Sequence, residues 1–193
     1  MVLTASTMLP LGTKAPDFEL PDVVSRKIIS LSNYSGKKAI LVMFICQHCP
    51  FVKHIKVQLS QLGSDYVNSN LGIIAISSND ISNHPEDAPE YLQAMAQELS
   101  LTFPICYDEN QEIAKAYTAA CTPDFFLFDG SQQLVYRGQL DDSRPSNGKP
   151  VTGADLRAAI NTVLADEPVK IEQKPSVGCN IKWKHGNTPT YYG

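Results

Sequence analysis

The sequence lacks the features that indicate export, membrane insertion or nucleic-acid binding. No apolar run approaches the roughly 20 residues that span a bilayer. The N-terminal stretch MVLTASTMLPLGTKAPDF has neither a basic n-region nor a proper apolar h-region. Charged residues make up only 19%, and the net charge of −4 offers no basic surface for nucleic acid or an anionic membrane. These absences predict a cytoplasmic protein with no nucleic-acid partner and no membrane partner.

Cysteine is also scarce, with five residues in a chain of 193. An odd count does not fit the disulfide framework of a secreted domain. In a reducing compartment, paired cysteines are more often catalytic or metal-binding than structural. A four-cysteine zinc site commonly uses a second C-x-x-C, and the sequence has none. The cysteines therefore favour redox chemistry, and we expect no cofactor and no metal.

The chain alternates strand and helix patterns, which predicts an α/β domain with a mixed central sheet and helices on both faces. We expect this domain over 1–167 and a C-terminal tail over 168–193 that packs on it. The expected elements, in chain order, are a hairpin of 18–20 with 28–31, a strand at 39–45, a helix over 51–66, a strand at 71–76, a helix opening at Pro89, a short helix over 111–118, a hairpin of 125–128 with 134–138, and a last helix through Leu164.

The stretch FICQHCPFV carries the most informative motif, a C-x-x-C pair formed by Cys46 and Cys49. Cys46 follows the first buried strand, and we place it where a helix begins. Unpaired N–H groups and the helix dipole would stabilise a thiolate there, so we expect the pKa of Cys46 to fall below about 8.5. Cys49 is close enough to form a disulfide across one turn. His48 between them can stabilise the Cys46 thiolate and make the disulfide more oxidising.

A second motif, ACTPDFFLFDG, places Thr122-Pro123 just before an apolar strand, where a cis proline can occur. A C-x-x-C at a strand-to-helix junction and a Thr-Pro ahead of a hairpin resemble the thioredoxin superfamily. APDFELPD, ISSND, CTPDFFLFD and GCNIKWK resemble its peroxiredoxin-like branch, the alkyl hydroperoxide reductase and thiol-specific antioxidant (AhpC/TSA) family, over roughly residues 10–185. The resemblance implies a thioredoxin fold with an N-terminal β-hairpin extension.

The motifs also depart from this family. The resemblance implies a peroxiredoxin motif P-x-x-x-T-x-x-C that ends in the peroxidatic cysteine. Aligning Cys49 with that cysteine puts Cys46 at the threonine and Val42 at the proline. The corresponding thioredoxin motif is W-C-G-P-C. Here Ile45 replaces the tryptophan and a Gln-His pair replaces Gly-Pro. The acidic residue found within the central strand of many thioredoxins is absent from AILVMFI. The recognition surface and the proton route are therefore expected to differ.

We predict a thiol–disulfide oxidoreductase in which Cys46 attacks as thiolate and Cys49 resolves the mixed disulfide. Backbone groups of Thr122 and Pro123 would hold an extended segment of a protein substrate. The expected partners are a protein disulfide or thiol, or a thioredoxin-type reductant, and the chain is expected to be a monomer or homodimer.

Two alternatives remain open at this point. The first is a thiol peroxidase in which Cys49 attacks peroxide and Cys46 resolves. The second is a non-enzymatic protein that holds a soft metal, Cu(I) or zinc, on Cys46, Cys49 and Cys121.

The remaining cysteines have less defined roles. Cys121 lies in the loop that the resemblance places opposite the C-x-x-C motif, so it is either a third site thiol or a packing residue. Cys179 follows a flexible glycine, and we expect Trp183 to anchor the tail and place Cys179 for exchange with Cys121 or Cys46. Cys106 is predicted to be a buried small hydrophobe. His54 and His84 are predicted to be surface residues.

Overall fold

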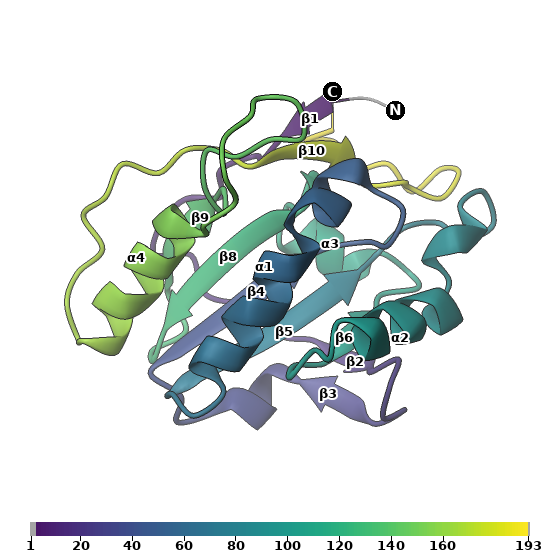
Figure 1. Cartoon of the computed structure of the whole chain (residues 1–193). Helices are drawn as coiled ribbons and strands as arrows, with labels where there is room; N and C mark the ends of the chain where they lie inside the picture. The colour runs from purple at the N-terminus through teal and green to yellow at the C-terminus, as the bar shows by residue number, and fades with distance from the viewer. Residues whose placement is uncertain (1–2, 193) are drawn as a thin grey trace.

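A mixed five-stranded sheet in the order β6-β5-β4-β8-β9 forms the centre of the fold, as Figure 1 shows. The computed structural model describes residues 3–192. β4 pairs parallel with β5, which pairs parallel with β6, while β8 lies antiparallel to both β4 and β9. The strands are β4 (Ala39–Phe44), β5 (Leu71–Ser77), β6 (Ile105–Tyr107), β8 (Asp124–Asp129) and β9 (Leu134–Gly138).

Helices cover both faces of this sheet, as the sequence predicted. Three of them pack on one face, in front of the sheet in Figure 1, and the short α3 lies behind it. The helices are α1 (Pro50–Tyr66), α2 (Pro89–Glu98), α3 (Glu112–Ala116) and α4 (Ala154–Leu164). None of the helices among residues 3–192 combines the length and apolar character needed to cross a bilayer.

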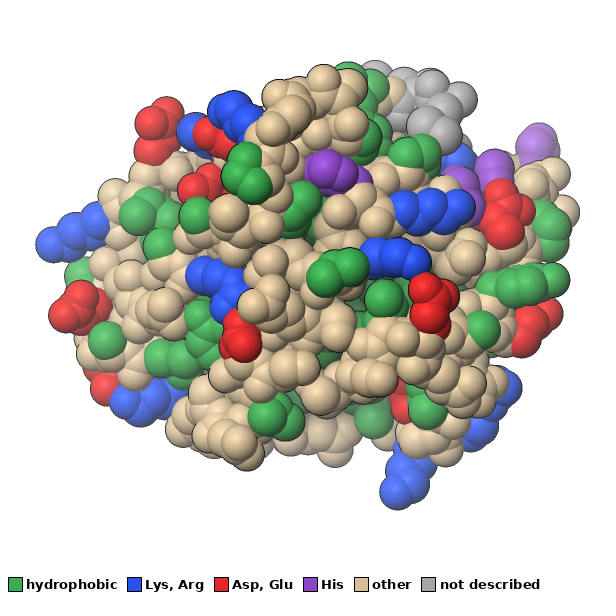
Figure 2. All heavy atoms as spheres, in the orientation of Figure 1, with side chains coloured by type: hydrophobic (Ala, Val, Ile, Leu, Met, Phe, Trp, Pro, Cys, Tyr) green, Lys and Arg blue, Asp and Glu red, His purple; other side chains and the backbone are tan. Residues whose placement is uncertain are grey.

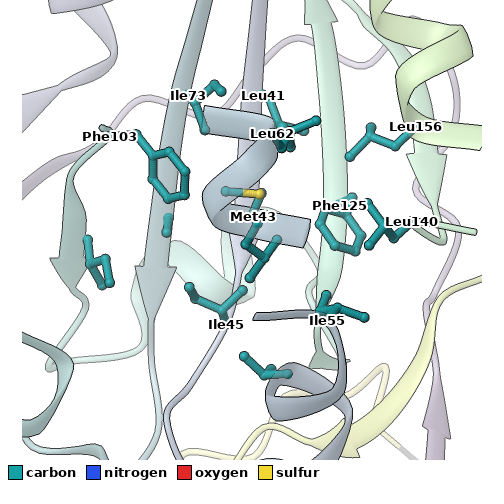
Figure 3. Close-up of a cluster of buried hydrophobic side chains, with 14 of the residues drawn as sticks. Leu41, Met43, Ile45, Ile55, Leu62, Ile73, Phe103, Phe125, Leu140 and Leu156 are labelled. Atoms are coloured by element: carbon teal, nitrogen blue, oxygen red, sulfur yellow. The ribbon is translucent and has the colours of Figure 1, made fainter. Parts of the chain in front are cut away.

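Side-chain alternation along the central strands divides the interior into two cores. Leu41, Met43 and Ile45 face α1, where they meet Ile55 and Leu62 (Figure 3). All five are buried, and each contributes about 1.5–3 kcal/mol of transfer free energy. Because both faces of β4 are covered, the strand is apolar at every position, which is why its pattern predicted a central strand.

The second core lies on the opposite face of the sheet. Phe44, Tyr117, Phe126 and Phe128 are fully buried there, and their rings meet tilted or edge to face at centroid distances of 5.6–5.9 Å. Such aromatic pairs add about 0.5–1.5 kcal/mol each beyond their buried area. This core fixes the position of the segment that leads from α3 to β8, and that segment carries part of the site.

The predicted N-terminal hairpin is confirmed, because β2 (Glu19–Pro21) pairs antiparallel with β3 (Ile28–Ser30). The predicted hairpin of β8 and β9 is also confirmed. Short 3-10 helices follow at Leu31–Tyr34 and Pro85–Asp87.

A small second sheet, in the order β1-β10-β7, was not predicted. Its strands are β1 (Leu3–Ala5), β10 (Val177–Asn180) and β7 (Cys121–Thr122), all antiparallel. In Figure 1 this sheet lies at the top, above the end of the central sheet, with β10 beside α1. The tail therefore contributes a strand that joins both the N-terminal segment and the loop before β8, while the proposed boundary at residue 167 stays a prediction.

Candidate active site

The candidate site lies where β4 ends, between the start of α1 and the small sheet. The loop after β4 carries Cys46 and Cys49, β7 carries Thr122, and β10 carries Cys179. All three cysteines are buried, with relative exposures of 0%, 0% and 1%. In Figure 2 histidine side chains reach the surface in the upper part of the view, while acidic and basic side chains are interspersed over the same face.

Cys49, and not Cys46, occupies the start of the helix. α1 begins at Pro50, so Cys49 is its N-cap residue and the proline stands in the first turn, where its missing N–H costs no intrahelical bond. Hydrogen bonding from the Cys46 thiol holds the pKa of Cys49 well below its ordinary value, and the Cys179 thiol and the backbone N–H of Val52 act in the same direction, against desolvation. Cys49 is therefore the thiolate of the group.

The expectation of a lowered pKa at Cys46 is wrong. Burial raises the pKa of Cys46 well above its ordinary value, and the hydrogen bond to Cys49 and the nearby charge of Asp87 add to the effect. The physical reason is position: Cys46 precedes the helix start by four residues, so the unpaired N–H groups of α1 do not surround it. Its sulfur lies 3.3 Å from the hydroxyl of Thr122.

Cys179 brings a second thiol into contact with Cys49. The two sulfurs lie 2.9 Å apart, and both are free thiols. This separation exceeds the S–S bond length of about 2.05 Å, but a small movement closes it. Burial raises the pKa of Cys179 to about 12, so it keeps its proton beside the Cys49 thiolate. The sequence predicted exchange of Cys179 with Cys121 or Cys46, and the structure instead brings it to Cys49.

Thr122 and Pro123 are joined by a cis peptide bond at the edge of the site. The carbonyl oxygen of Thr122 lies 3.2 Å from the Cys49 sulfur and accepts its S–H when Cys49 is protonated. The carbonyl oxygen of Pro123 accepts a hydrogen bond from the Ser176 hydroxyl at 2.5 Å. The backbone that was expected to bind a substrate segment is instead paired with β10 of the same chain.

His48 lies in the same site, and its orientation is fixed by Asp87, a residue that the sequence analysis missed. The carboxylate of Asp87 is fully buried. It lies 2.5 Å from Nδ1 of His48, and it accepts hydrogen bonds from the backbone N–H groups of Gln47 and His48 and from the Asn79 amide. These bonds lower the pKa of Asp87, although burial opposes them. One weak signal for Asp87 was available, an acidic residue in the segment after the second buried strand.

His84 differs from its prediction as a plain surface residue. Its ring stacks on that of His48, with centroids 5.1 Å apart and an interplanar angle of 10°. His54 is partly buried, and its Nε2 lies 2.8 Å from the Ser143 hydroxyl. The site therefore has a histidine pair on its outer side, of which the sequence indicated only His48.

The other two cysteines do not share the environment of Cys49. The Cys121 sulfur lies 3.7 Å from the Pro123 carbonyl oxygen, and burial together with the charge of Asp124 raises its pKa well above the ordinary value. Cys106 lies in β6 and is fully buried, as predicted. Burial raises the pKa of Cys106 to about 12. Both remain protonated thiols near neutral pH.

Two groups of side chains within residues 3–192 each bring three possible metal ligands close together. One joins Cys46, His48 and Asp87, and the other joins His48, His84 and Glu86. The soft-metal set expected from Cys46, Cys49 and Cys121 is not among the groups found in this part of the chain, because the Cys121 sulfur is directed to the Pro123 carbonyl. The metal-binding alternative on these three cysteines stays a prediction.

Comparison with known proteins places this arrangement in a family. The model of the AhpC/TSA family matches residues 11–137, which include β4, the C-x-x-C loop, β7 and the hairpin of β8 and β9. The chain belongs to the AhpC/TSA family. Its fold is the thioredoxin fold that the motifs indicated, and β10 lies outside the matched residues.

Individual relatives of this AhpC/TSA chain carry two kinds of name. The Mycobacterium tuberculosis protein named "Putative peroxiredoxin Rv2521" is 28% identical over 117 residues, 61% of this chain and 69% of that protein. Thiol-disulfide oxidoreductase ResA of Geobacillus thermodenitrificans is 27% identical over 139 residues, 71% of this chain and 75% of that protein. Both names describe proteins of thiol redox chemistry.

A solved structure matches nearly the whole AhpC/TSA chain. The crystal structure of an uncharacterized conserved protein from Geobacillus kaustophilus has a TM-score of 0.93 and 51% identity, and it covers 95% of this chain and 97% of its own. The similarity thus extends beyond the matched family region to the segment that holds β10.

Proposed function

We propose that this protein is a thiol–disulfide oxidoreductase in which Cys49 is the nucleophile. The observation that carries the proposal is the position of the Cys49 sulfur at the N-cap of α1, with a lowered pKa and with the thiol of Cys179 only 2.9 Å away. A thiolate beside a second thiol is the combination that thiol–disulfide exchange requires. The names of the ResA relatives support the same chemistry.

In the proposed reaction, the Cys49 thiolate attacks one sulfur of a disulfide and the other sulfur leaves as a thiol. A second protein thiol, Cys46 or Cys179, then attacks Cys49 and releases the rest of the substrate. His48 and Asp87 act through Cys46 as positioning residues, because the buried carboxylate sets the charge beside that thiol.

The partner of this reaction is also proposed from the sequence. The sequence predicts a protein disulfide or thiol, or a thioredoxin-type reductant, and a chain that is a monomer or homodimer. A cytoplasmic location would suit this chemistry, since a reducing compartment returns the site to its thiol form after each turnover.

The test is a single-turnover oxidation of the reduced protein by 2-hydroxyethyl disulfide, followed by trypsin digestion and mass spectrometry. We expect the label on Cys49 first and an internal disulfide that contains Cys49 at the end. Cys49→Ser should abolish the reaction, whereas Cys106→Ser, a matched loss of a buried thiol, should leave it intact. Retention of the reaction in Cys49→Ser would contradict the proposal.

A second candidate is a thiol peroxidase with Cys49 as the peroxidatic residue. The lowered pKa of Cys49 and the relatives named as peroxiredoxins favour it. The positions that shape the peroxide pocket in P-x-x-x-T-x-x-C hold Val42 and Cys46 here, which favours the disulfide reaction over it. Consumption of hydrogen peroxide by the same reduced protein, measured beside the disulfide assay, ranks the two activities.

A further inference from the structure

The strand β10 occupies the edge of β7 as an added antiparallel strand. Cys179 stands opposite Thr122 and Asn180 opposite Cys121, and the N–H of Ile181 donates to the Ala120 carbonyl at 3.1 Å. An extended polypeptide that added to β7 beside Cys49 would form the same ladder. The chain therefore fills this edge with its own tail, and the residue that faces the nucleophile is a cysteine.

Contacts on both sides hold β10 in this position. Its other edge pairs with β1, in which Leu3 stands opposite Cys179. Beyond the strand, the N–H of Lys182 donates to Oδ1 of Asn79 at 2.8 Å, and the Lys182 carbonyl accepts from the N–H of Asp80 at 2.8 Å. Trp183 packs against the second core. Lifting β10 from β7 would break these contacts together.

The fit of β10 on β7 leaves no space at the point of contact. A Cβ added at Gly178 would lie 2.0 Å from the Thr122 carbonyl oxygen, so only glycine allows this approach. The small cavity lined by Phe51, Pro123, Ser176 and Val177 has a volume of about 20 Å³, enough for about one water molecule. A further strand does not fit there, whereas a small-molecule disulfide needs no strand pairing with β7.

We infer that β10 occupies the edge of β7 on which an extended polypeptide substrate would otherwise pair. It places Cys179 where the cysteine of a bound polypeptide would lie, and it restricts the outside substrates of Cys49 to small-molecule disulfides. The inference rests on the proposed function, since it takes Cys49 to be the nucleophile. It names the substrate class of that site and identifies Cys179, ahead of Cys46, as the resolving thiol.

The reaction that follows is balanced in atoms and electrons. The Cys49 thiolate attacks a small disulfide RSSR, forms a Cys49–S–S–R bond and releases RS⁻, which takes a proton from solvent. The thiol of Cys179 then loses its proton and attacks the Cys49 sulfur, and the second RS⁻ leaves with that proton. One RSSR becomes two RSH, and the two protein thiols become one disulfide between Cys49 and Cys179.

The test compares two disulfide probes on the reduced full-length protein, 2-hydroxyethyl disulfide and insulin. Rates of protein oxidation are followed by acid quenching and mass spectrometry, with peptide mapping of the product. We expect insulin to react at least about tenfold more slowly than 2-hydroxyethyl disulfide. We also expect the first internal disulfide to join Cys49 and Cys179.

Two variants distinguish the role of the β10 strand from the role of the Cys179 thiol. Gly178→Ala should force β10 away from Thr122 and raise the insulin rate, relative to the small-disulfide rate, at least about fivefold. Gly130→Ala is the control, because Gly130 has no left-handed φ and an added Cβ would stay 3.3 Å from the nearest atom, the Lys37 carbonyl oxygen. Circular dichroism establishes that both variants are folded. Cys179→Ser keeps the strand, so insulin should stay excluded while the mixed disulfide on Cys49 persists longer.

The possible outcomes can be told apart. Equal rates with the two probes in the wild type, or an unchanged ratio in folded Gly178→Ala, would overturn the role of β10 alone. Loss of the mixed disulfide at the wild-type rate in Cys179→Ser would overturn the role of Cys179 as the resolving thiol. No reaction of Cys49 with either probe would overturn the proposed function, and this inference with it.

Discussion

Cys49 and Cys106 are equally buried, yet their chemistry differs. Cys106 lies in β6 within the second core, where burial and the charge of Asp22 raise its pKa to about 12. Cys49 lies at the start of α1 among donors, and its pKa is lowered. Desolvation raises the pKa of both, so the difference comes from the donor groups around Cys49. Burial alone makes a thiol inert, whereas burial with donors makes it a nucleophile.

The largest expected effect is the loss of disulfide-exchange activity when Cys49, the thiolate of the two compared cysteines, is replaced. Cys49→Ser should lower the rate of disulfide exchange by about 100-fold or more, because a serine hydroxyl is not ionised near neutral pH. Cys106→Ser should leave the rate within about twofold. The measurement is the single-turnover rate with 2-hydroxyethyl disulfide. Similar losses in both variants would mean that the two thiols act together or that the fold has failed, which circular dichroism would reveal.

The second prediction concerns the pH dependence of the Cys49 thiol. A lowered pKa keeps Cys49 ionised below the usual thiol value of about 8.5, so its alkylation by iodoacetamide should stay fast as the pH falls toward about 6. Cys46→Ala removes the hydrogen bond that contributes most to this shift and should lower the rate at pH 6 by about tenfold. Labelling of Cys46 ahead of Cys49 in the wild type would contradict the assignment.

The third prediction concerns Asp124, whose buried carboxyl accepts a hydrogen bond from the Ser6 hydroxyl at 2.8 Å, while its Oδ2 has no hydrogen-bond partner within residues 3–192. Burial raises the pKa of Asp124 to about 7. The folded protein therefore binds this proton more tightly than the unfolded chain does, and stability falls as the pH rises from about 4 to about 7.

Asp124→Asn should remove this loss of stability. At pH 8 we expect the variant to gain between about 1 and 4 kcal/mol in the free energy of unfolding, because one pKa unit corresponds to about 1.4 kcal/mol. At pH 4 the difference should nearly vanish. Urea denaturation at the two pH values measures it. A gain of equal size at both would show that the carboxyl is not the titrating group.

The smallest expected effect is on the redox potential. His48→Ala leaves the buried carboxylate of Asp87 without its ring partner, which disfavours thiolates in the site and makes the disulfide formed by Cys49 more reducing. We expect a shift of about 30 mV toward negative values, which for a two-electron couple corresponds to about 1.4 kcal/mol. A glutathione redox titration measures it. An unchanged potential would mean that Asn79 and the backbone N–H groups hold the carboxylate unaided.

Local sequence patterns predicted the parts of the fold that depend on them. The continuous apolar run of β4 and the spaced apolar residues of α1 each reflect burial by direct neighbours in the fold. The residues of the small sheet carry no such pattern, because β7 and β10 are short and their partner strands lie far away in the sequence. Long-range pairing of two to four residues leaves almost no periodic signal.

The site was predictable in its members more than in its roles. The C-x-x-C spacing and the Thr-Pro pair indicated Cys46, Cys49 and Thr122 correctly as neighbours. The assignment of the thiolate depended on whether the helix starts at residue 46 or at residue 50, a four-residue difference that sequence patterns do not resolve. The contact of Cys179 with Cys49 depended on the register of β10, which only tertiary structure fixes.

The position of β10 late in the chain has a consequence for synthesis on the ribosome. Domains fold from the N-terminus as the chain emerges, and the helix and strands that surround Cys49 precede β10 by many residues. Until β10 arrives, the edge of β7 is open and Cys49 has no thiol from the tail beside it. A nascent chain therefore passes through a stage in which the β7 edge beside the proposed nucleophile is open, and the arrival of β10 ends that stage.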